Sequence, residues 1–266
     1  GQILHLHDVT ETRKLRERVK RNERLTALGE VSAALSHQIR TPLSAALLYS
    51  AQLGDDDLGE ADRGRFSNRL GAALMNIETL VRDMLLFVRG EVLGSERVAV
   101  AALLARLPRA LETQLDRFRA DLDIGTAQAS AVILGNADAL LSVLQNLIMN
   151  ALEAGATQVS VGTLETGSSD GCIRFEVHDD GPGIDTEVSG HVFDAFFTTR
   201  AGGTGLGLAV ARNVVRAHGG DIEMESAPGA GCRFIIRLPL AGSPDMSNPV
   251  ACDGAAVPAG TKGAAA

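Results

Sequence analysis

Apolar residues in the first third of the chain recur at spacings of three, four and seven along two long segments. This spacing places them on one face of an α-helix, and it predicts helices over residues 12–53 and from about residue 66 to residue 88. The acidic run Asp55–Glu60 predicts the turn between them. Two antiparallel helices of this length cannot bury their apolar faces alone, so we expect a homodimer that forms a four-helix bundle. The stripes comprise Leu15, Val19, Asn22, Leu28, Leu35, Ile39, Leu43 and Ala46, then Phe66, Leu70, Leu74, Ile77, Leu80, Met84 and Val88.

From about residue 97 the periodicity changes to short alternating runs separated by turn residues. The pattern predicts one mixed sheet backed by helices, an α/β sandwich, and the whole chain is therefore expected to have an α+β fold. The glycine run at 203–207 lacks the G-x-G-x-x-G spacing of a Rossmann unit. We expect strands at 98–100, 122–124, 159–164, 172–178, 221–226 and 232–239, with a helix at 138–155.

His37 lies off the apolar stripe of the first helix and five residues before Pro42. Because Pro42 has no N–H and its ring crowds the preceding turn, we expect a kink beside the histidine. A lone histidine on a helix is more often a surface residue than a reactive one, so the assignment depends on the surrounding residues.

The run at 35–43, Leu-Ser-His-Gln-Ile-Arg-Thr-Pro-Leu, resembles the H box of the sensor histidine kinases. The resemblance implies that His37 is the phosphate acceptor, through Nε2. With an ordinary pKa of about 6.5, its ring is mostly neutral at pH 7 and has a lone pair for attack. Thr41 matches the position that orients water for dephosphorylation of the partner protein. The alternative, that Thr41 merely precedes Pro42, stays open.

Gln38 departs from the family pattern, in which an acidic residue follows the histidine. An amide oxygen can accept a hydrogen bond from Nδ1 of the imidazole and fix its tautomer. It has no charge and cannot act as a base near neutral pH. We therefore expect a working but slower kinase, accelerated by Gln38→Glu.

Asn146 and Asn150 are four residues apart and share one face of the predicted helix at 138–155. Asparagine is a poor helix former, so two in mid-helix require a reason; an exposed polar face is the alternative. The stretch resembles the ATP site of the gyrase, Hsp90, histidine kinase and MutL superfamily. That resemblance implies that Asn150 is a Mg²⁺ ligand and that Asn146 lies near the phosphates. ATP-hydrolysing relatives have Glu at position 146, so Asn146 favours a kinase.

Three more stretches match that superfamily in order. The Asp-Asp-Gly-Pro-Gly turn at 179–183 implies that Asp179 binds the adenine amino group, with Gly181 and Gly183 permitting close approach. The stretch at 192–200 looks like the F box, a lid in which Thr199 and Arg200 face ATP and Arg200 pairs with the γ-phosphate. Alone, these stretches read as an ordinary turn and ordinary apolar core.

The glycine run that opens the next predicted helix is the last of the four motifs. Its backbone N–H groups make an anion site for phosphates. A glycine run alone is weak evidence, but four motifs in family order after an H box are strong evidence. The residues assigned to the phosphates are Gly203, Thr204, Gly205, Leu206 and Gly207.

The predicted domains are the end of a truncated PAS-like sensor (1–11), a dimerisation and phosphotransfer domain (12–90), a hinge (91–96), an ATP-binding domain of Bergerat type (97–240) and a disordered tail (241–266). A net charge of −8 argues against nucleic acid as a direct partner. No run approaches the roughly 18 apolar residues of a membrane span, and no signal peptide opens the chain. Three widely spaced cysteines indicate neither a disulfide framework nor a metal knuckle. A cytoplasmic location is expected.

The H box is also similar to that of the flagellar regulatory kinases of the FleS and FlrB type. This implies that the partner is the receiver domain of a response regulator that activates sigma-54-dependent transcription. The expected activity is ATP-dependent autophosphorylation on His37 and transfer of the phosphate to a receiver aspartate. Two alternatives remain: a phosphatase or pseudokinase scaffold, and an ATPase of the same superfamily without phosphotransfer. Neither the input signal nor transfer within or between protomers follows from the sequence.

Overall fold

The computed structural model describes residues 32–55, 58–89, 96–125, 131–166, 171–200 and 203–241. They fall into two compact units, one made of Gly1–Glu91 with Gly190–Asn213 and the other of Val92–Ser189 with Val214–Ala266. Within the described ranges, none of the helices combines the length and apolar character that a membrane span requires. The predicted PAS-like segment, and the predicted tail beyond Ala241, lie outside these ranges.

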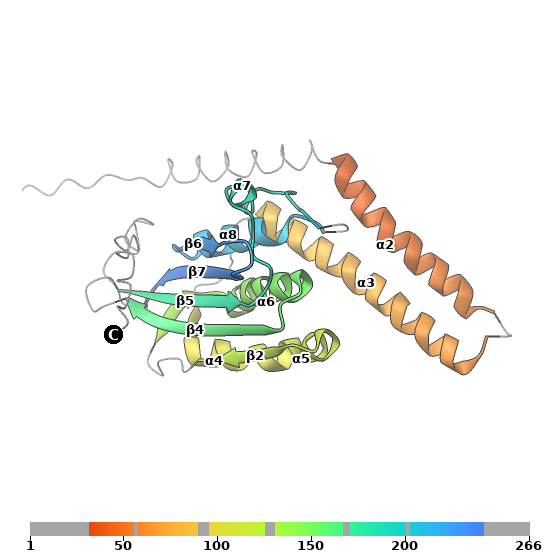
Figure 1. Ribbon diagram of the computed structural model, residues 1–266, viewed down its shortest axis with the longest axis horizontal. Coiled ribbons are helices and arrows are strands. Elements are labelled where there is room, and N and C mark those ends of the chain that lie inside the picture. The colour runs from red at the N-terminus through yellow and green to blue at the C-terminus, as the bar shows by residue number, and fades with distance from the viewer. Residues whose placement is uncertain are drawn as a thin grey trace, which may run out of the picture. The chain divides into compact units, whose positions relative to one another are not determined.

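A helical hairpin forms most of the first unit (Figure 1). Helix α2 (Ser32–Leu53) continues through Pro42, and α3 (Glu60–Arg89) returns beside it. Near the turn, the rings of Tyr49 and Phe66 stack with centroids 6.2 Å apart. The two helices confirm the prediction of a helical hairpin. The first part of the first predicted helix, residues 12–31, lies outside the described residues.

Seven large apolar side chains in the described part of the hairpin are exposed. Its buried hydrophobic residues, among those described, are Ala46, Ala73 and Leu80. Small side chains at two of these three positions let the helices approach closely but bury little apolar surface. The hairpin therefore leaves a wide apolar surface uncovered, made of Leu43, Leu47, Leu48, Leu74, Met75, Val81 and Leu85.

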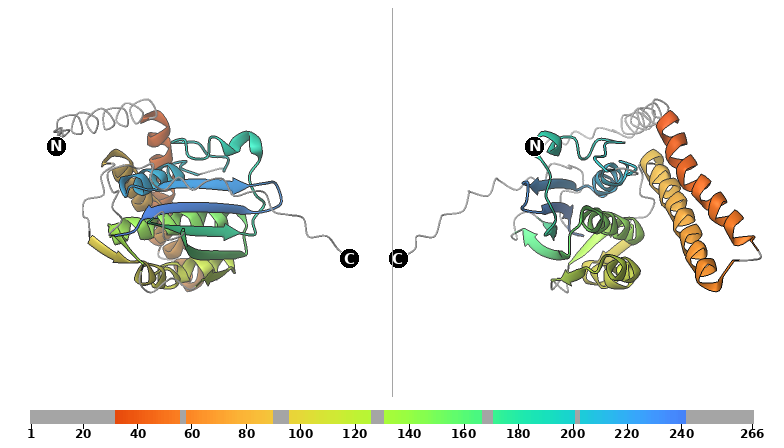
Figure 2. Two further views of the ribbon diagram at one scale, coloured as in Figure 1. Left: turned by 90° about the vertical axis from the view of Figure 1, so that its left-hand side faces the viewer. Right: turned by 45° about the vertical axis from the view of Figure 1, so that its right-hand side comes forward.

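A mixed five-stranded sheet with the order β2-β4-β5-β7-β6 is the centre of the second unit. β2 and β4 are parallel and the other neighbours are antiparallel. Its helices cover one face of the sheet (Figure 2). The strands are β2 (Asp121–Ile124), β4 (Gln158–Thr166), β5 (Cys172–Asp179), β6 (Asp221–Ser226) and β7 (Cys232–Pro239).

A small second sheet and five helices complete the sandwich. β1 (Glu96–Ala99) pairs antiparallel with β3 (Val132–Gly135). The helices are α4 (Val100–Ala105), α5 (Leu107–Phe118), α6 (Ala137–Ala154), α7 (Thr186–Ser189) and α8 (Gly207–Ala217), whose first residues belong to the other compact unit. The architecture confirms the predicted fold class, a helical hairpin followed by an α/β sandwich.

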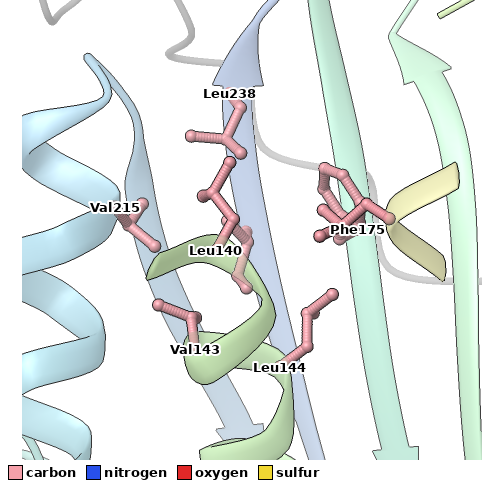
Figure 3. Close-up of a pocket in the computed structure, with 8 residues that line it drawn as sticks. Leu140, Val143, Leu144, Phe175, Val215 and Leu238 are labelled. Carbon is pink, nitrogen blue, oxygen red and sulfur yellow. The ribbon is translucent and has the colours of Figure 1, made fainter. Parts of the chain in front are cut away.

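The alternation of β5 decides which of its side chains enter the core. Ile173, Phe175, Val177 and Asp179 are buried, whereas the residues between them point to the opposite face, as strand geometry requires. On that face, Arg233 on β7 bonds the carboxylate of Glu176 at 2.8 Å. Inside, a small pocket between the sheet, α4, α6 and α8 is wholly apolar (Figure 3), so it is a packing gap of the core. Its lining is Leu103, Leu140, Val143, Leu144, Phe175, Val215, Ile236 and Leu238.

Several details differ from the sequence expectations, and Glu60, assigned to the turn of the hairpin, begins α3. Glu96, assigned to the hinge, begins β1, and Val100, assigned to a strand, begins α4. The pairing of β1 with β3 ends at Ala99, so the chain is free to turn into a helix there. Cys172 is disulfide-bonded, whereas no disulfide was expected; wide spacing in sequence does not keep cysteines apart once the chain folds.

Candidate functional site

Asn146 and Asn150 lie one turn apart on α6. This helix begins at a capped end, where Oδ1 of Asn136 accepts the N–H of Ala139 at 2.9 Å. Leu147 and Ile148 are fully buried and fix the rotation of the helix, which leaves both asparagines half-buried. Nδ2 of Asn150 donates to Oδ1 of Asn146 at 3.2 Å. The bond orients the Asn150 amide.

This orientation fits the magnesium assignment. The amide nitrogen of Asn150 donates to Asn146, and the oxygen of the same amide is an atom of the type that binds a hard cation. Mg²⁺ prefers oxygen ligands and is commonly held by one or two protein oxygens together with waters and substrate phosphates. The described residues contain no cluster of three or more His, Cys, Asp or Glu side chains that could hold a metal. A single amide oxygen such as that of Asn150 suits a Mg²⁺ ion whose other ligands are substrate phosphates and waters.

Asp179 is a buried carboxylate at the end of β5, with 4% of its surface exposed. Its Oδ1 accepts the N–H of Gly181 at 2.9 Å and the N–H of Cys232 at 3.3 Å. These two bonds fix the carboxylate and leave Oδ2 to accept a hydrogen from a ligand. A carboxylate oxygen in this position can accept a hydrogen bond from an N–H donor, such as an exocyclic amino group.

Asp180, the next residue, has a different role. It is exposed, and its carboxylate accepts from the N–H and the hydroxyl of Thr157, both at 2.8 Å, and from the N–H of Gln158 at 2.9 Å. The pKa of Asp180 is lowered, most by the Gln158 N–H and next by Thr157. Asp180 thus ties the turn to the start of β4, a role the sequence did not reveal.

Three glycines let the turn after Asp179 pack against backbone. Gly183 and Gly231 both have φ values in the left-handed region, at 72° and 74°. A Cβ on Gly183 would overlap the carbonyl of Ala227, and one on Gly231 would overlap the carbonyl of Asp179. A Cβ on Gly181 would lie 2.7 Å from Oδ1 of Asp179. Gly181, Gly183 and Gly231 therefore allow close packing around this turn, and the role of Gly181 and Gly183 toward a nucleotide stays a prediction.

Ser226 holds the same turn from the β6–β7 side. Its hydroxyl accepts the N–H of Ile184 at 2.8 Å and donates to the carbonyl of Gly231 at 2.7 Å. The Cys232 thiol lies 3.2 Å from this hydroxyl, and burial raises the pKa of the thiol. Cys232 is therefore a neutral neighbour of Asp179. The sequence analysis missed Ser226, Gly231 and Cys232 because they lie about 50 residues from the turn they support.

The F box and the glycine run are joined by backbone hydrogen bonds. The N–H of Phe196 donates to the carbonyl of Gly205 at 2.8 Å. Both residues have left-handed φ values, 68° and 63°, and a Cβ on Gly205 would overlap the backbone of Phe196. The guanidinium of Arg212 lies 5.5 Å from the Phe193 ring centroid and anchors the segment to α8.

Short turns shape the rest of the predicted phosphate loop. The N–H of Arg200 donates to the Thr198 hydroxyl at 3.1 Å, and the N–H of Gly203 returns to the Arg200 carbonyl at 3.2 Å. The Thr204 hydroxyl accepts the N–H of Leu206 at 3.2 Å. Thr199 is exposed, Arg200 is half-buried, Leu206 is fully buried and Gly207 begins α8.

Gln38 on α2 contacts this loop within the same compact unit. Its Nε2 donates to the carbonyls of Gly203 and Thr204 at 3.4 and 3.3 Å. His37 lies on α2 just before it, and Thr41 is exposed one turn later. The predicted site residues thus form two groups. Gln38 and residues 199–207 lie in one compact unit, and Asn146, Asn150, Asp179, Gly181 and Gly183 in the other.

Two family models match the chain. Residues 27–92 match the His Kinase A (phospho-acceptor) domain. Residues 135–242 match the histidine kinase-, DNA gyrase B-, and HSP90-like ATPase domain. The first match contains the whole hairpin with His37, and the second contains both asparagines, Asp179 and the glycine run.

Individual relatives agree with these matches. The sensor protein kinase FleS of Pseudomonas aeruginosa is 40% identical over 240 residues, which are 90% of this chain and 59% of FleS. The signal transduction histidine-protein kinase AtoS of Escherichia coli is 29% identical, with 90% of this chain and 39% of AtoS covered. The chain thus spans less than two thirds of these relatives.

Solved structures give the same answer. The histidine kinase ThkA, in complex with the response regulator protein TrrA, superposes with a TM-score of 0.67 at 27% identity, covering 88% of this chain and 68% of ThkA. Full-length ShkA, in complex with AMPPNP, gives a TM-score of 0.58 at 26% identity, covering 80% of this chain and 46% of ShkA. A phospho-acceptor helix followed by an ATPase-like sandwich, in this order, places the chain in the sensor histidine kinase family.

Proposed function

We propose that this chain transfers the γ-phosphate of ATP to His37 and then to an aspartate of a response regulator. The observation that carries the proposal is the hydrogen-bonded Asn146–Asn150 pair on α6, downstream of the acceptor helix. At position 146, a Glu would be a base for water, and an asparagine amide is not. The site therefore suits transfer to a side chain better than hydrolysis.

The residues of the sandwich bind the nucleotide in this proposal. Oδ2 of Asp179 accepts a hydrogen bond from the adenine amino group. The glycines at 181, 183 and 231 have no side chains, so they permit close packing of the backbone around Asp179. The Asn150 amide oxygen would hold Mg²⁺, and the ion would supply positive charge against the triphosphate. Backbone N–H groups at the start of α8 face the phosphates.

The acceptor step forms one bond and breaks one. Nε2 of His37 attacks the γ-phosphorus in line, the bond from that phosphorus to the β–γ bridging oxygen breaks, and ADP leaves. Nδ1 keeps its hydrogen throughout, so a hydrogen-bond acceptor for Nδ1–H stabilises the charge that develops on the ring. Positioning of the two reactants supplies most of the rate.

The uncovered apolar surface of the hairpin supports a homodimer as the working form. Leu47, Leu48 and Met75 are each more than half exposed. Soluble monomers rarely leave contiguous apolar patches of this kind in water. A second hairpin packed on this surface would make the four-helix bundle expected from the stripe.

The phosphate acceptor is proposed to be a receiver domain, as the printed pairing of ThkA with the regulator TrrA suggests. The finer proposal, a regulator that activates sigma-54-dependent transcription, rests on the similarity to FleS. Adding candidate receivers to the phosphorylated chain and scoring the rate of phosphate transfer identifies the partner.

Incubation with γ-labelled ATP tests the activity. We expect acid-labile label on the chain that is lost in His37→Ala and retained in His178→Ala, a control at an exposed histidine on β5. Asn150→Ala should abolish labelling because it removes the Mg²⁺ ligand. Release of free phosphate without labelled protein would instead identify an ATPase and overturn the proposal.

A phosphatase toward the regulator is the second candidate, favoured by the uncharged amide of Gln38. Compared with wild type, Gln38→Glu should label His37 faster, because a charged carboxylate accepts the hydrogen bond from Nδ1–H more strongly than an amide does and better stabilises the charge that develops on the ring. An unchanged or lower rate would contradict a kinase limited by Gln38. Loss of label from a phosphorylated receiver on addition of the His37→Ala chain would support the phosphatase.

A further inference from the structure

Gln38 on α2 makes a long-range contact with the glycine run. Its Nε2 donates to two consecutive carbonyls, those of Gly203 and Thr204, at 3.4 and 3.3 Å. The two positions are 165 and 166 residues apart in sequence, so no local pattern could have revealed the contact. Gln38 is half-buried, and its Oε1 is buried without a hydrogen-bond partner among the described residues.

The geometry of the peptide bond determines what this contact leaves accessible. In a trans peptide, the C=O of one residue and the N–H of the next point in opposite directions. When Gln38 takes the carbonyls of Gly203 and Thr204, the N–H groups of Thr204 and Gly205 therefore point away from α2. The Gly205 carbonyl is held by the N–H of Phe196 at 2.8 Å. Three consecutive carbonyls are thus engaged, and the intervening N–H groups are turned toward the opposite side.

We propose that Gln38 is a positioning residue that docks the glycine loop onto the acceptor helix through its amide N–H. In this arrangement the loop presents its N–H groups to the triphosphate while its carbonyl side rests beside His37. A methionine of similar size has no donor, and a glutamate at neutral pH would set two acceptor oxygens against two carbonyl oxygens. Of these three side chains, only the glutamine amide can donate to the two carbonyls. The kinetic part of this inference rests on the proposed kinase activity, whereas the docking itself does not.

The magnitudes reconcile this role with the expected gain from Gln38→Glu. Two long hydrogen bonds contribute no more than roughly tenfold to an equilibrium between docked and undocked loop. A well-placed acid or base contributes about 10²- to 10⁴-fold to a rate. Gln38→Glu therefore loses a small contribution to the docking equilibrium and gains a larger contribution to the rate of phosphate transfer. For this reason the labelling rate of Gln38→Glu alone does not measure docking.

Hydrogen exchange of the loop measures docking without chemistry. In the full chain carrying His37→Ala, which removes the acceptor, Gln38→Met and Gln38→Glu should each speed exchange in the peptide Phe196–Val210 about fivefold. Gln52→Met and Gln52→Glu make the same changes at an exposed glutamine on α2 and should leave the exchange unchanged. Unchanged exchange in both Gln38 variants, or equal effects at Gln52, overturns the proposal.

Steady-state kinetics then separate positioning from nucleotide binding. Gln38→Met should lower the rate of His37 labelling at saturating Mg-ATP several-fold and change KM for ATP less than about twofold, because the contact involves loop carbonyls and not phosphate-binding N–H groups. A raised KM with an unchanged maximal rate overturns the positioning role. Absence of label in the wild-type chain would instead contradict the proposed function. The hydrogen-exchange result does not depend on kinase activity, so it tests docking in either case.

Discussion

The hairpin and the sandwich differ in how far they bury their apolar side chains. Among the described residues of α2 and α3, only Ala46, Ala73 and Leu80 are buried hydrophobics, and large side chains such as Leu47 are mostly exposed. In the sandwich, α6 alone contributes nine buried apolar residues, and Leu164 is the single large exposed hydrophobic in the described ranges. The sandwich buries its large apolar side chains within one chain, whereas the described hairpin leaves seven of its own exposed.

Because of this difference, the same type of mutation should affect different quantities in the two regions. In the proposed homodimer, a substitution among the exposed apolar residues of the hairpin should act on association, because a second copy would cover them. A substitution in the sandwich should act on the free energy of unfolding of each chain. The predictions below compare matched pairs of residues in the two regions.

The largest expected effect is on association. Leu47→Asp should convert a dimer into monomers, because each copy loses the burial of a leucine that is 65% exposed in the single chain. Burying one leucine contributes about 1.5–3 kcal/mol, so two copies lose roughly 3–6 kcal/mol of dimer stability. Sedimentation velocity over a range of concentrations measures the change.

Leu164→Asp is the control for Leu47→Asp. Leu164 is 51% exposed on β4, so the same substitution there should leave the association state unchanged. A dimer of Leu47→Asp as tight as the wild type would show that the apolar surface of the hairpin has another use.

The second prediction concerns the sandwich. Phe175 on β5 is 1% exposed and lines the apolar gap seen in Figure 3. Phe175→Ala should lower the free energy of unfolding by about 3–5 kcal/mol, since it removes a buried ring and leaves a cavity. Urea denaturation measures this loss, and Leu164→Ala should change the same quantity by about 0.5 kcal/mol or less. Equal effects at the two positions would mean that β5 does not lie at the centre of the core.

Local periodicity was sufficient to predict the hairpin helices, α6 and most strands, because each is specified by its own run of apolar residues. It placed Asp179 after the strand, but the buried alternation of β5 extends through Asp179 and is what turns its carboxylate inward. It missed β3, which has only four residues and pairs with an equally short β1.

The remainder of the site depends on contacts between distant segments. Gly231 packs on the carbonyl of Asp179, and Gln38 donates to a loop more than 160 residues away. For Gln38 the sequence suggested only a local partner, the neighbouring His37. Such contacts follow from the tertiary fold and leave no periodic signal in the chain.

The third prediction is a pH dependence that belongs to the sandwich. His218 is 8% exposed; its Nδ1 donates to the Val214 carbonyl at 2.7 Å, and its Nε2 accepts the N–H of Asn136 at 3.0 Å. Burial lowers the pKa of His218. Protonation would set two N–H groups against each other, so the folded state favours the neutral ring.

Because the folded-state pKa of His218 is below the unfolded value of about 6.5, the unfolded chain binds more protons between the two pKa values. The stabilisation is therefore complete above about pH 6.5 and decreases as the pH falls toward the folded-state pKa, by up to about 1.4 kcal/mol per pH unit. Urea denaturation from pH 5 to pH 8 should show this slope in the wild type. His218→Gln should reduce it, and His178→Gln, at an exposed histidine, should not. A wild-type slope that persists in His218→Gln would assign the dependence to other groups.

The smallest expected effect tests whether α6 depends on its own cap as well as on the core. Oδ1 of Asn136 accepts the N–H of Ala139, which has no partner inside the helix. Asn136→Ala should lower the free energy of unfolding by about 1 kcal/mol, and Asn136→Ser, which keeps an oxygen at the cap, should restore most of it. Both variants keep the backbone N–H that His218 accepts, so the pH slope should be the same in both. If Asn136→Ala lowered the free energy of unfolding as much as Phe175→Ala, the cap and the core of α6 would not be separate contributions. If it changed the pH dependence of that free energy, the side chain of Asn136 would also hold His218.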